Sequence, residues 1–283
     1  MSEIGGGHVD SDDLFVRARA VLLDALEALS EHRDAVIVIG AQAVYLRTGG
    51  VDVAIAEATK DSDVAIDIRI LGDDPTIDAA MLKANFHPNP DKRQPGSWIS
   101  AEGIPVDVMV PEALAGKGSR SVEMPPHDKM AARRAVGLEA VVIDYSEIPI
   151  PTLDPGDHRS ITANVAGPAA LLVAKCHKIG ERVNDKNPNR LADKDAHDIY
   201  RILVKFSTES LAETFAHLLA DPLSADVTEQ AVNYLQSLFG DGPEATGSVM
   251  AGRAEEGVGE PATVSAAISY LASDLVEAVR ADE

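Results

Sequence analysis

The sequence has 283 residues, 45% of them hydrophobic, which is enough chain for one large domain or two modest domains with a buried core. Lys and Arg number 25 against 46 Asp and Glu, and the net charge of −21 argues against broad, nonspecific binding to nucleic acid. The single cysteine excludes an intrachain disulfide. With an acidic N-terminus unlike a signal peptide, and no apolar run near the about 20 residues of a membrane span, we expect a soluble, cytoplasmic protein.

The first part of the chain alternates helical and extended patterns. Ser11 is suited to cap a helix that runs to about Glu31, and Asp12 and Asp13 suit the positive end of that helix's dipole. The short apolar run "AVIVIG" (35–40) is typical of a buried strand, and a short helix follows it. Further predicted elements are a strand at 62–70, a helix at 76–86 and a hairpin across 98–111.

The later part of the chain changes from strands to helices. We predict a strand at 138–145 ("LEAVVIDY"), with extended segments at 147–151 and 152–165 following it. Helices are predicted at 168–183, 193–206, 208–220, 226–239 and 264–281. Residues 240–262 are rich in Gly, Ala and Glu, and we predict a mobile segment there. The organisation we expect is an α+β domain at 1–158 and a helical domain at 159–283.

Aspartates gather on one face of the strand predicted at 62–70. Asp61 and Asp63 are two residues apart in an extended segment, so their carboxylates project from the same face. Asp107 lies on another strand with an apolar far side, and it is placed to join them. Three carboxylates on one surface repel unless a cation neutralises them, and oxygen ligands suit Mg²⁺ or Mn²⁺. The alternative is a solvent-facing strand with scattered acids. Asp67 lies further along the strand, and we interpret it as an outer or surface residue.

Two other features favour phosphate chemistry. Gly40 lies at a strand-to-helix junction, where the N–H groups at the start of a helix favour a phosphate. Two divalent metals can clamp the attacking and leaving oxygens of a phosphoryl displacement.

The chain is also locally basic after residue 116. Such a run is more often a solvated loop than a nucleic-acid contact. Its cations are Lys117, Arg120, Lys129, Arg133 and Arg134.

The predicted helix at 168–183 carries a stripe of cations. Lys175, Lys178 and Arg182 are spaced i, i+3, i+7 and therefore share one face, which suits a triphosphate. Asp195 and Asp198 are spaced i, i+3 on the next helix and can face that stripe. The alternative is that these two acids pair with the lysines and lock the two helices together. His197 next to Asp198 does not make a phosphohydrolase of the HD type, because no second spaced His motif accompanies it.

The order strand–Gly–helix, Asp-x-Asp strand, Asp strand resembles the nucleotidyltransferase (polymerase-β-like) superfamily. More narrowly, "GAQA" from Gly40 and "TKDSD" from Thr59 resemble the motifs of the AbiEii-type proteins, which include the MenT-type toxins of type IV toxin–antitoxin systems. Their second domain is matched by "AKCHKIGER" and "DKDAHDIY". The resemblance covers about residues 35–205. Ala41 departs from the usual Gly or Ser, and "GGVDVAIAEA" (49–58) resembles an inserted flap.

The resemblance implies a mixed sheet with flanking helices plus a C-terminal helical domain. It implies Asp61, Asp63 and Asp107 as catalytic residues and ligands of Mg²⁺ or Mn²⁺. The nucleotide-binding residues it implies are Gly40, Ala41, Lys175, Lys178, Arg182, Asp195 and Asp198. It also implies a nucleoside triphosphate substrate, tRNA as an acceptor, a toxin or phage-defence role and a cognate antitoxin. Two alternatives stay open: transfer to a small molecule of the antibiotic type, and a catalytically inactive binding module that keeps the fold.

Overall fold

A computed structural model describes residues 11–49, 61–90, 94–116, 118, 120–183, 185 and 191–281 of the chain. Residues 50–60 lie outside the described residues. They hold most of the segment interpreted as an inserted flap, together with Thr59 of the motif, so both stay predictions. The first helix begins at Ser11, and the role of Ser11 as its cap also stays a prediction.

A mixed β-sheet lies at the centre of the described chain and confirms the predicted α+β class. Its strands are β1 (Val36–Ile39), β2 (Ser62–Ile66), β3 (His87–Pro88), β4 (Ser97–Ile99), β5 (Pro105–Pro111), β6 (Arg133–Ala135), β7 (Tyr145–Pro151) and β8 (Ser160–Ala166). The order across the sheet is β3-β4-β5-β2-β1-β8-β7, and β6 pairs with β5 outside this path. Strand β2 runs antiparallel to β1 and parallel to β5, so the middle of the sheet is mixed.

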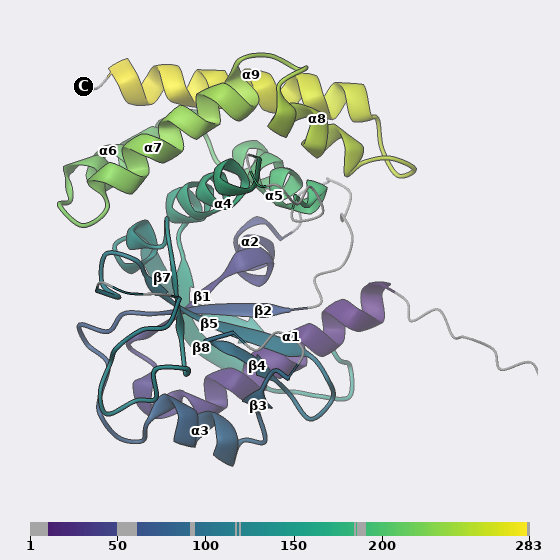
Figure 1. The fold of residues 1–283 in the computed structure, drawn as a ribbon. Coiled ribbons are helices and arrows are strands. Elements are labelled where there is room, and N and C mark those ends of the chain that lie inside the picture. Colours follow the sequence, from purple (N-terminus) through teal and green to yellow (C-terminus); the bar gives the residue numbers. More distant parts are fainter. Residues whose placement is uncertain are drawn as a thin grey trace, which may run out of the picture.

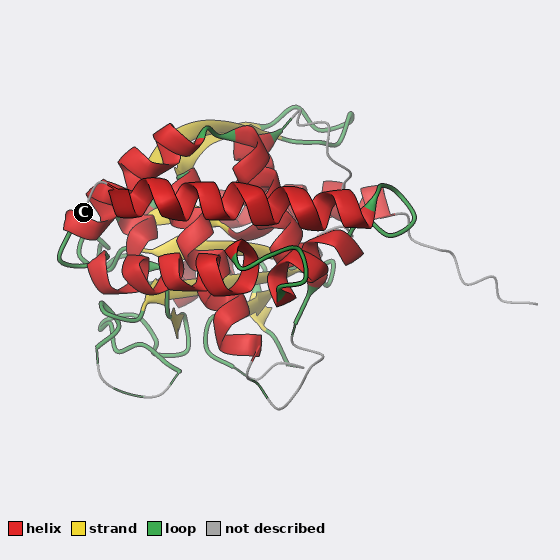
Figure 2. Cartoon of the chain, turned by 90° about the horizontal axis from the view of Figure 1, so that it is seen from above, coloured by secondary structure: helices red, strands yellow, loops and turns green. Residues whose placement is uncertain are grey.

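Helices cover both faces of the sheet (Figure 1). On one face lie α1 (Ser11–Ala28) and α3 (Ile77–Lys83), and on the other lie α2 (Gly40–Thr48), α4 (Pro168–Val183) and α5 (Asp193–Lys205). An outer layer contains α6 (Thr208–Ala220), α7 (Ala225–Leu235), the π-helical turn η4 (Gln236–Gly240), α8 (Thr246–Arg253) and α9 (Pro261–Ala281). Seen from above, α9 extends along this outer layer (Figure 2). Short 3₁₀ turns are η1 (Ser30–His32) and η2 (Glu139–Val142).

Burial on both sides of the sheet explains why the central strand β1 is entirely apolar. All four residues of β1 are buried, because helices cover the sheet on both sides. In β2, the Ser62 hydroxyl donates to the Ala18 carbonyl of α1 at 3.0 Å, so Ser62 faces the α1 side. Side chains alternate along a strand, so Asp63 faces the opposite side, toward α2 and α4. The sheet thereby delivers Asp63 to the face that carries the helical layer.

Strand β2 ends at Ile66, earlier than the predicted residue 70. The Asp67 N–H donates to the Ala35 carbonyl at 2.9 Å, and the Asp67 carboxylate accepts two bonds from the Arg69 guanidinium at 2.9 and 2.7 Å. Asp67 is buried, so it is not a surface residue, and its role as an outer neighbour of the metal ligands stays a prediction. Ile70, the last residue of the predicted strand, is 54% exposed. The chain turns after Asp67, whose carbonyl accepts a hydrogen bond from the Ile70 N–H at 3.3 Å.

Two other predicted boundaries differ from the structure. The apolar run at 138–145 forms the 3₁₀ turn η2 rather than a strand, and only Tyr145 belongs to a strand, β7. A short apolar run fits a buried turn as well as a strand, which is why its pattern misled the prediction. Strand β8 pairs with both β1 and β7, so the sheet continues past the predicted boundary at 158. The change from sheet to helices lies at Gly167.

The segment predicted to be mobile, 240–262, contains helix α8, and it packs against neighbouring elements. A Cβ added to Gly247 would lie 2.5 Å from the Phe239 ring, and one added to Gly252 would lie 2.6 Å from the Pro261 carbonyl. Glycine and alanine in this segment therefore allow close helix packing. Composition alone does not distinguish small residues that pack closely from small residues that are flexible.

This close packing predicts that Gly252→Ala lowers the free energy of unfolding, which is opposite to the usual effect of this change in a helix. In a solvent-exposed helix the change would raise the free energy of unfolding by about 0.5–1 kcal/mol, because alanine favours helix. Here the added Cβ would overlap the Ser265 hydroxyl and the Pro261 carbonyl, so we expect a loss of about 1–3 kcal/mol in urea denaturation. Gly72→Ala is the control, because a Cβ at Gly72 meets its nearest neighbour at 3.6 Å. Stabilisation by Gly252→Ala would contradict the packed arrangement.

Helix α9 bears on the expectation that no segment spans a membrane. The length and composition of α9 alone would allow it to cross a membrane. Its buried residues, among them Ile268, Leu275 and Val279, belong to the hydrophobic core. A core helix of this length passes the same composition test, so α9 is weak evidence for a membrane span.

Candidate active site

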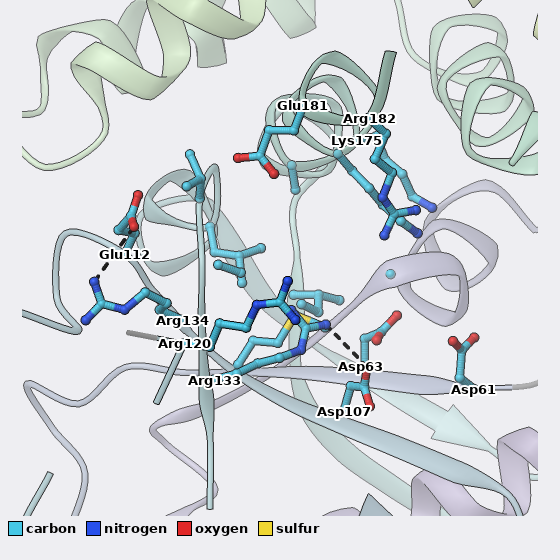
Figure 3. Close-up of a pocket in the computed structure, with 18 of the residues that line it drawn as sticks. Asp61, Asp63, Asp107, Glu112, Arg120, Arg133, Arg134, Lys175, Glu181 and Arg182 are labelled. Atoms are coloured by element: carbon cyan, nitrogen blue, oxygen red, sulfur yellow. Dashed lines mark hydrogen bonds and ion pairs between the residues drawn. The ribbon is translucent and has the colours of Figure 1, made fainter. Parts of the chain in front are cut away.

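The register of the central strands brings two of the predicted aspartates together. Asp63 of β2 is directly opposite Asp107 of β5 in a parallel pair, and opposite Ile39 at the end of β1. Adjacent strands lie about 4.8 Å apart, and paired residues point to the same face. Asp61 precedes Asp63 by two residues, and Figure 3 shows all three carboxylates along one side of the sheet. The prediction that Asp107 shares the face of Asp63 is confirmed.

Gly40 makes room for Asp63. It follows β1 directly, has a φ of +69° and begins α2. A Cβ added at this position would overlap the Asp63 carboxylate. The left-handed conformation and the close approach both require glycine. The backbone at the start of α2 therefore lies against the Asp63 carboxylate, where the N–H groups that follow can meet an anion.

Gly40→Ala should affect both the stability and the site. Alanine at positive φ costs about 1–2 kcal/mol, and the overlap with Asp63 adds a displacement of that carboxylate. Gly116→Ala is a matched control, because Gly116 has a φ of +70° and a Cβ there meets nothing within 4 Å. We expect Gly40→Ala to lower the melting temperature more than the control and to weaken Mn²⁺ binding, measured by electron paramagnetic resonance (EPR). Equal effects of both variants would contradict the close approach.

Ionisation of all three aspartates of the cluster is unfavourable. Burial, followed by the charges of Asp61 and Asp107, raises the pKa of Asp63 to about 6, whereas Lys178 and Arg133 act to lower it. A carboxylate is disfavoured where its neighbours are also negative and water is excluded. The face between β2 and β5 therefore favours a cation.

Helix α4 carries its predicted stripe of cations close to the aspartates, and the charge of Lys178 acts on Asp63. The Lys175 ammonium donates to Asp195 at 2.7 Å and to Asp198 at 2.6 Å, and the Lys178 ammonium donates to Asp195 at 2.8 Å. Arg182 lies 3.6 Å from Asp195. The structure thus brings together the five predicted residues of α4 and α5. It also shows the ion pairs that the alternative reading of Asp195 and Asp198 describes.

The side chains of these ion pairs differ in how far they are exposed. The Lys175 and Asp195 side chains are 6% and 2% exposed, whereas that of Lys178 is 36% exposed. Burial opposes both charges of the Lys175–Asp195 pair, but the partners outweigh it: the Lys175 pKa is held above and the Asp195 pKa well below its usual range. Lys178 and Arg182 therefore remain the more accessible cations.

The cleft between the sheet and α4 has a volume of about 530 Å³. Seven predicted site residues line it: Gly40, Asp61, Asp63, Asp107, Lys175, Lys178 and Arg182. Ala41, Asp195 and Asp198 are not among the lining residues. Figure 3 shows Lys175 and Arg182 extending from α4 toward the aspartates. The aspartates thus line one wall of the cleft, and the facing wall on α4 carries the three cations together with Glu181.

The sequence prediction missed the arginines of a third wall. Arg120, Arg133 and Arg134 line the cleft. The Arg133 guanidinium contacts the Asp107 carboxylate at 3.3 Å, and Arg134 lies 3.8 Å from Glu112 (Figure 3). The sequence shows these arginines as part of a basic run. Because that run was interpreted as a solvated loop, the strand β6, which carries Arg133 and Arg134, was not predicted. Lys129 of that run is exposed outside the cleft, and Lys117 lies outside the described residues.

The carboxylates fit a divalent cation by chemistry and charge. Asp61, Asp63 and Asp107 supply only oxygen ligands, and burial, together with the charges of Asp61 and Asp107, raises the Asp63 pKa. Within the described residues, no group of three His, Cys, Asp or Glu side chains is already close enough to enclose a metal. A cation would therefore have to draw the carboxylates together and take its remaining ligands from a substrate or water.

His197 has a partner that accounts for its burial. Its Nε2 lies 2.7 Å from the Glu255 carboxylate, which links α5 to the end of α8. Asp198, next in sequence, instead pairs with Lys175. This arrangement agrees with the rejection of an HD-type metal site.

Comparison with known proteins gives one similar solved structure to consider. No protein-family model matches the sequence, and no curated protein matches it. The chain is similar to the crystal structure of an antigenic nucleotidyltransferase-like protein from Paracoccidioides brasiliensis, at 15% identity and a TM-score of 0.33. The match covers 78% of this chain and 94% of that chain. At this level of similarity the activity of the chain has to be inferred from the chemistry of its own cleft.

Proposed function

We propose that the chain is a metal-dependent nucleotidyltransferase, which transfers NMP from a nucleoside triphosphate to a hydroxyl group of an acceptor. The observation that carries this proposal is the direct pairing of Asp63 with Asp107 in a cleft whose facing wall carries Lys178 and Arg182. Carboxylates attract a metal and the facing cations attract phosphate oxygens. A metal–triphosphate complex has both kinds of charge in one molecule.

Asp61, Asp63 and Asp107 would hold Mg²⁺ or Mn²⁺. When bound, such ions neutralise these carboxylates and stabilise the charge on the phosphates during transfer. The cleft is large enough for a drug-sized ligand. The metal, the triphosphate and the three aspartates form the core of the proposal.

The remaining side chains would position the nucleotide. The N–H groups that follow Gly40, including that of Ala41, would bind phosphate oxygens at the start of α2. Lys178 and Arg182 would bind the outer phosphates, because they are the more accessible cations of α4. Lys175 would add positive charge from below, and Asp195 and Asp198 would hold these cations in place.

The chemical step needs no covalent enzyme intermediate. The acceptor oxygen would form a bond to the α-phosphorus as the bond from that phosphorus to the bridging oxygen breaks, and pyrophosphate would leave. The proton of the attacking hydroxyl would pass to Asp107, whose carboxylate lies beside the site. The cations of α4 would keep the triphosphate in line for this displacement.

The acceptor we propose is the 3′ end of tRNA, with the chain as a toxin or phage-defence component that a cognate antitoxin counters. Arg120 and Arg134 at the cleft support an anionic acceptor locally. The net charge of −21 and the presence of Glu112 and Glu181 in the cleft favour a second candidate, a cationic small molecule with a hydroxyl group. An inactive binding module is the third outcome of the test.

The test incubates the protein with Mg²⁺, each labelled nucleoside triphosphate in turn, and either total tRNA or hydroxylated aminoglycosides. Label in RNA supports the tRNA acceptor, and label in the aminoglycoside supports the second candidate. Asp107→Asn should lower either transfer by more than about 100-fold, because it removes a metal ligand and the proton acceptor. No transfer with any nucleotide, together with unchanged Mn²⁺ binding in Asp107→Asn, would leave only the binding module.

A further inference from the structure

Arg133 contacts a carboxylate that the proposed metal needs. Strand β6 runs parallel to β5, with Arg133 paired to Met109, and this register carries the arginine back toward Asp107. The Arg133 Nη2 lies 3.3 Å from the Asp107 Oδ2, and the two side chains are 24% and 7% exposed. Figure 3 shows this contact within the cleft. The guanidinium therefore lies at one of the three carboxylates that line the cleft.

A guanidinium and a divalent cation compete for the Asp107 carboxylate. Both neutralise the same carboxylate, and two cations a few Å apart in a partly buried site repel strongly. The Arg133 charge also acts on the neighbouring Asp63. Without a metal, Arg133 relieves part of the repulsion within the aspartate cluster. With a metal present, the same contact becomes less favourable, because the two cations repel one another.

Arg133 can exchange this contact for one with an anion in the cleft. Its side chain lines the cleft, and its Nε–H has no hydrogen-bond partner among the described residues. A guanidinium forms paired, charge-assisted bonds with phosphate as readily as with carboxylate. A triphosphate in the cleft would therefore be able to bind Arg133 when the metal binds Asp107.

We propose that Arg133 couples metal binding to nucleotide binding: it occupies Asp107 in the metal-free protein and moves to the triphosphate when metal and nucleotide bind together. This inference rests on the proposed function. It implies that the metal alone binds weakly, and that the nucleotide strengthens metal binding as much as the metal strengthens nucleotide binding. The arrangement keeps the site from holding a metal before its substrate arrives.

The experiment measures Mn²⁺ binding by EPR without nucleotide, in the wild-type protein, Arg133→Gln and Arg120→Gln. Arg120 is the control, because it lines the same cleft with an exposed side chain and its loss removes the same charge. We expect Arg133→Gln to tighten Mn²⁺ binding about 5- to 10-fold, and Arg120→Gln to change it less than about 2-fold. With Mn²⁺ saturating, Arg133→Gln should weaken binding of a non-hydrolysable nucleoside triphosphate analogue about 10-fold.

The outcomes separate this inference from the proposed function. Unchanged or weaker Mn²⁺ binding in Arg133→Gln, with clear binding in the wild type, would overturn the role of Arg133 alone. Absence of Mn²⁺ binding in the wild type, in both the presence and the absence of the analogue, would overturn the proposed function. A second measurement needs no variant: nuclear magnetic resonance of ¹⁵N-arginine-labelled protein should show a change at Arg133 when Mg²⁺ and the analogue are added together. No change there would also overturn the inference.

Discussion

Asp63→Asn should make the metal-free protein more stable while it removes Mn²⁺ binding and transfer. The pKa of Asp63 rises from 3.8 to about 6, which corresponds to about 3 kcal/mol against the charged form. Removal of that charge relieves the cost of burying it and the repulsion from Asp61 and Asp107, so we expect the free energy of unfolding at pH 8 to rise by about 1–3 kcal/mol. Urea denaturation in the presence of a chelator measures this rise.

The pH dependence gives a second readout of the same substitution. A carboxyl group with a raised folded-state pKa is protonated more in the folded than in the unfolded protein, so its contribution to stability falls as pH rises from about 4 to about 6. The advantage of Asp63→Asn should therefore be small at pH 4, grow through pH 6 and stay constant above it.

Asp34→Asn is the control for both experiments, because Asp34 is 87% exposed and its pair with Arg33 lies on the surface. It should change the unfolding free energy by less than about 0.5 kcal/mol at any of these pH values. A lower stability of Asp63→Asn at pH 8 would contradict the account of the cluster as a site of stored repulsion. It would show instead that Asp63 makes a structural ion pair.

Lys175→Met should destabilise the protein by about 3–5 kcal/mol, because it leaves buried carboxylates without their main cation. Lys175 bridges Asp195 and Asp198, and Asp195 is almost completely buried. Methionine keeps much of the side-chain volume, so the loss reports the missing charge. Chemical denaturation at pH 7 measures it.

Lys178→Met provides the comparison on the same helix face. Lys178 also donates to Asp195, but its side chain is 36% exposed and Lys175 remains to neutralise the acid. We expect a loss below about 1 kcal/mol for this variant. In the proposed function, Lys178→Met should weaken binding of a triphosphate analogue. Equal destabilisation by both substitutions would contradict the division between a buried structural lysine and an accessible one.

The sequence predicted the aspartate site because strand periodicity is local. Alternation placed Asp61 and Asp63 on one face, and the same rule applied to Asp107. Their register across β2 and β5 depends on strand pairing between distant parts of the chain, which no local pattern specifies. Arg133 shows the same limit. It belonged to a basic run, and only the parallel pairing of β6 with β5 brings it to Asp107.

The helical part shows why composition misleads about packing. Gly252 and its neighbours suggested a mobile segment, yet they allow α8 to lie against α9. The helical spacing of Lys175 and Lys178 correctly predicted a shared face, but it left two roles open for Asp195. The distances show the ion pairs directly. Whether these cations also bind a triphosphate depends on a ligand that the sequence pattern alone does not specify.

The most direct test of the central claim is a crystal structure of the protein with Mn²⁺ and a non-hydrolysable nucleoside triphosphate analogue, with the metal located by its anomalous scattering. We expect an anomalous peak at about 2.1–2.2 Å from carboxylate oxygens of both Asp63 and Asp107, with the analogue's phosphates facing Lys178 and Arg182. A nucleotide bound elsewhere, or a peak that neither carboxylate contacts, would contradict the claim.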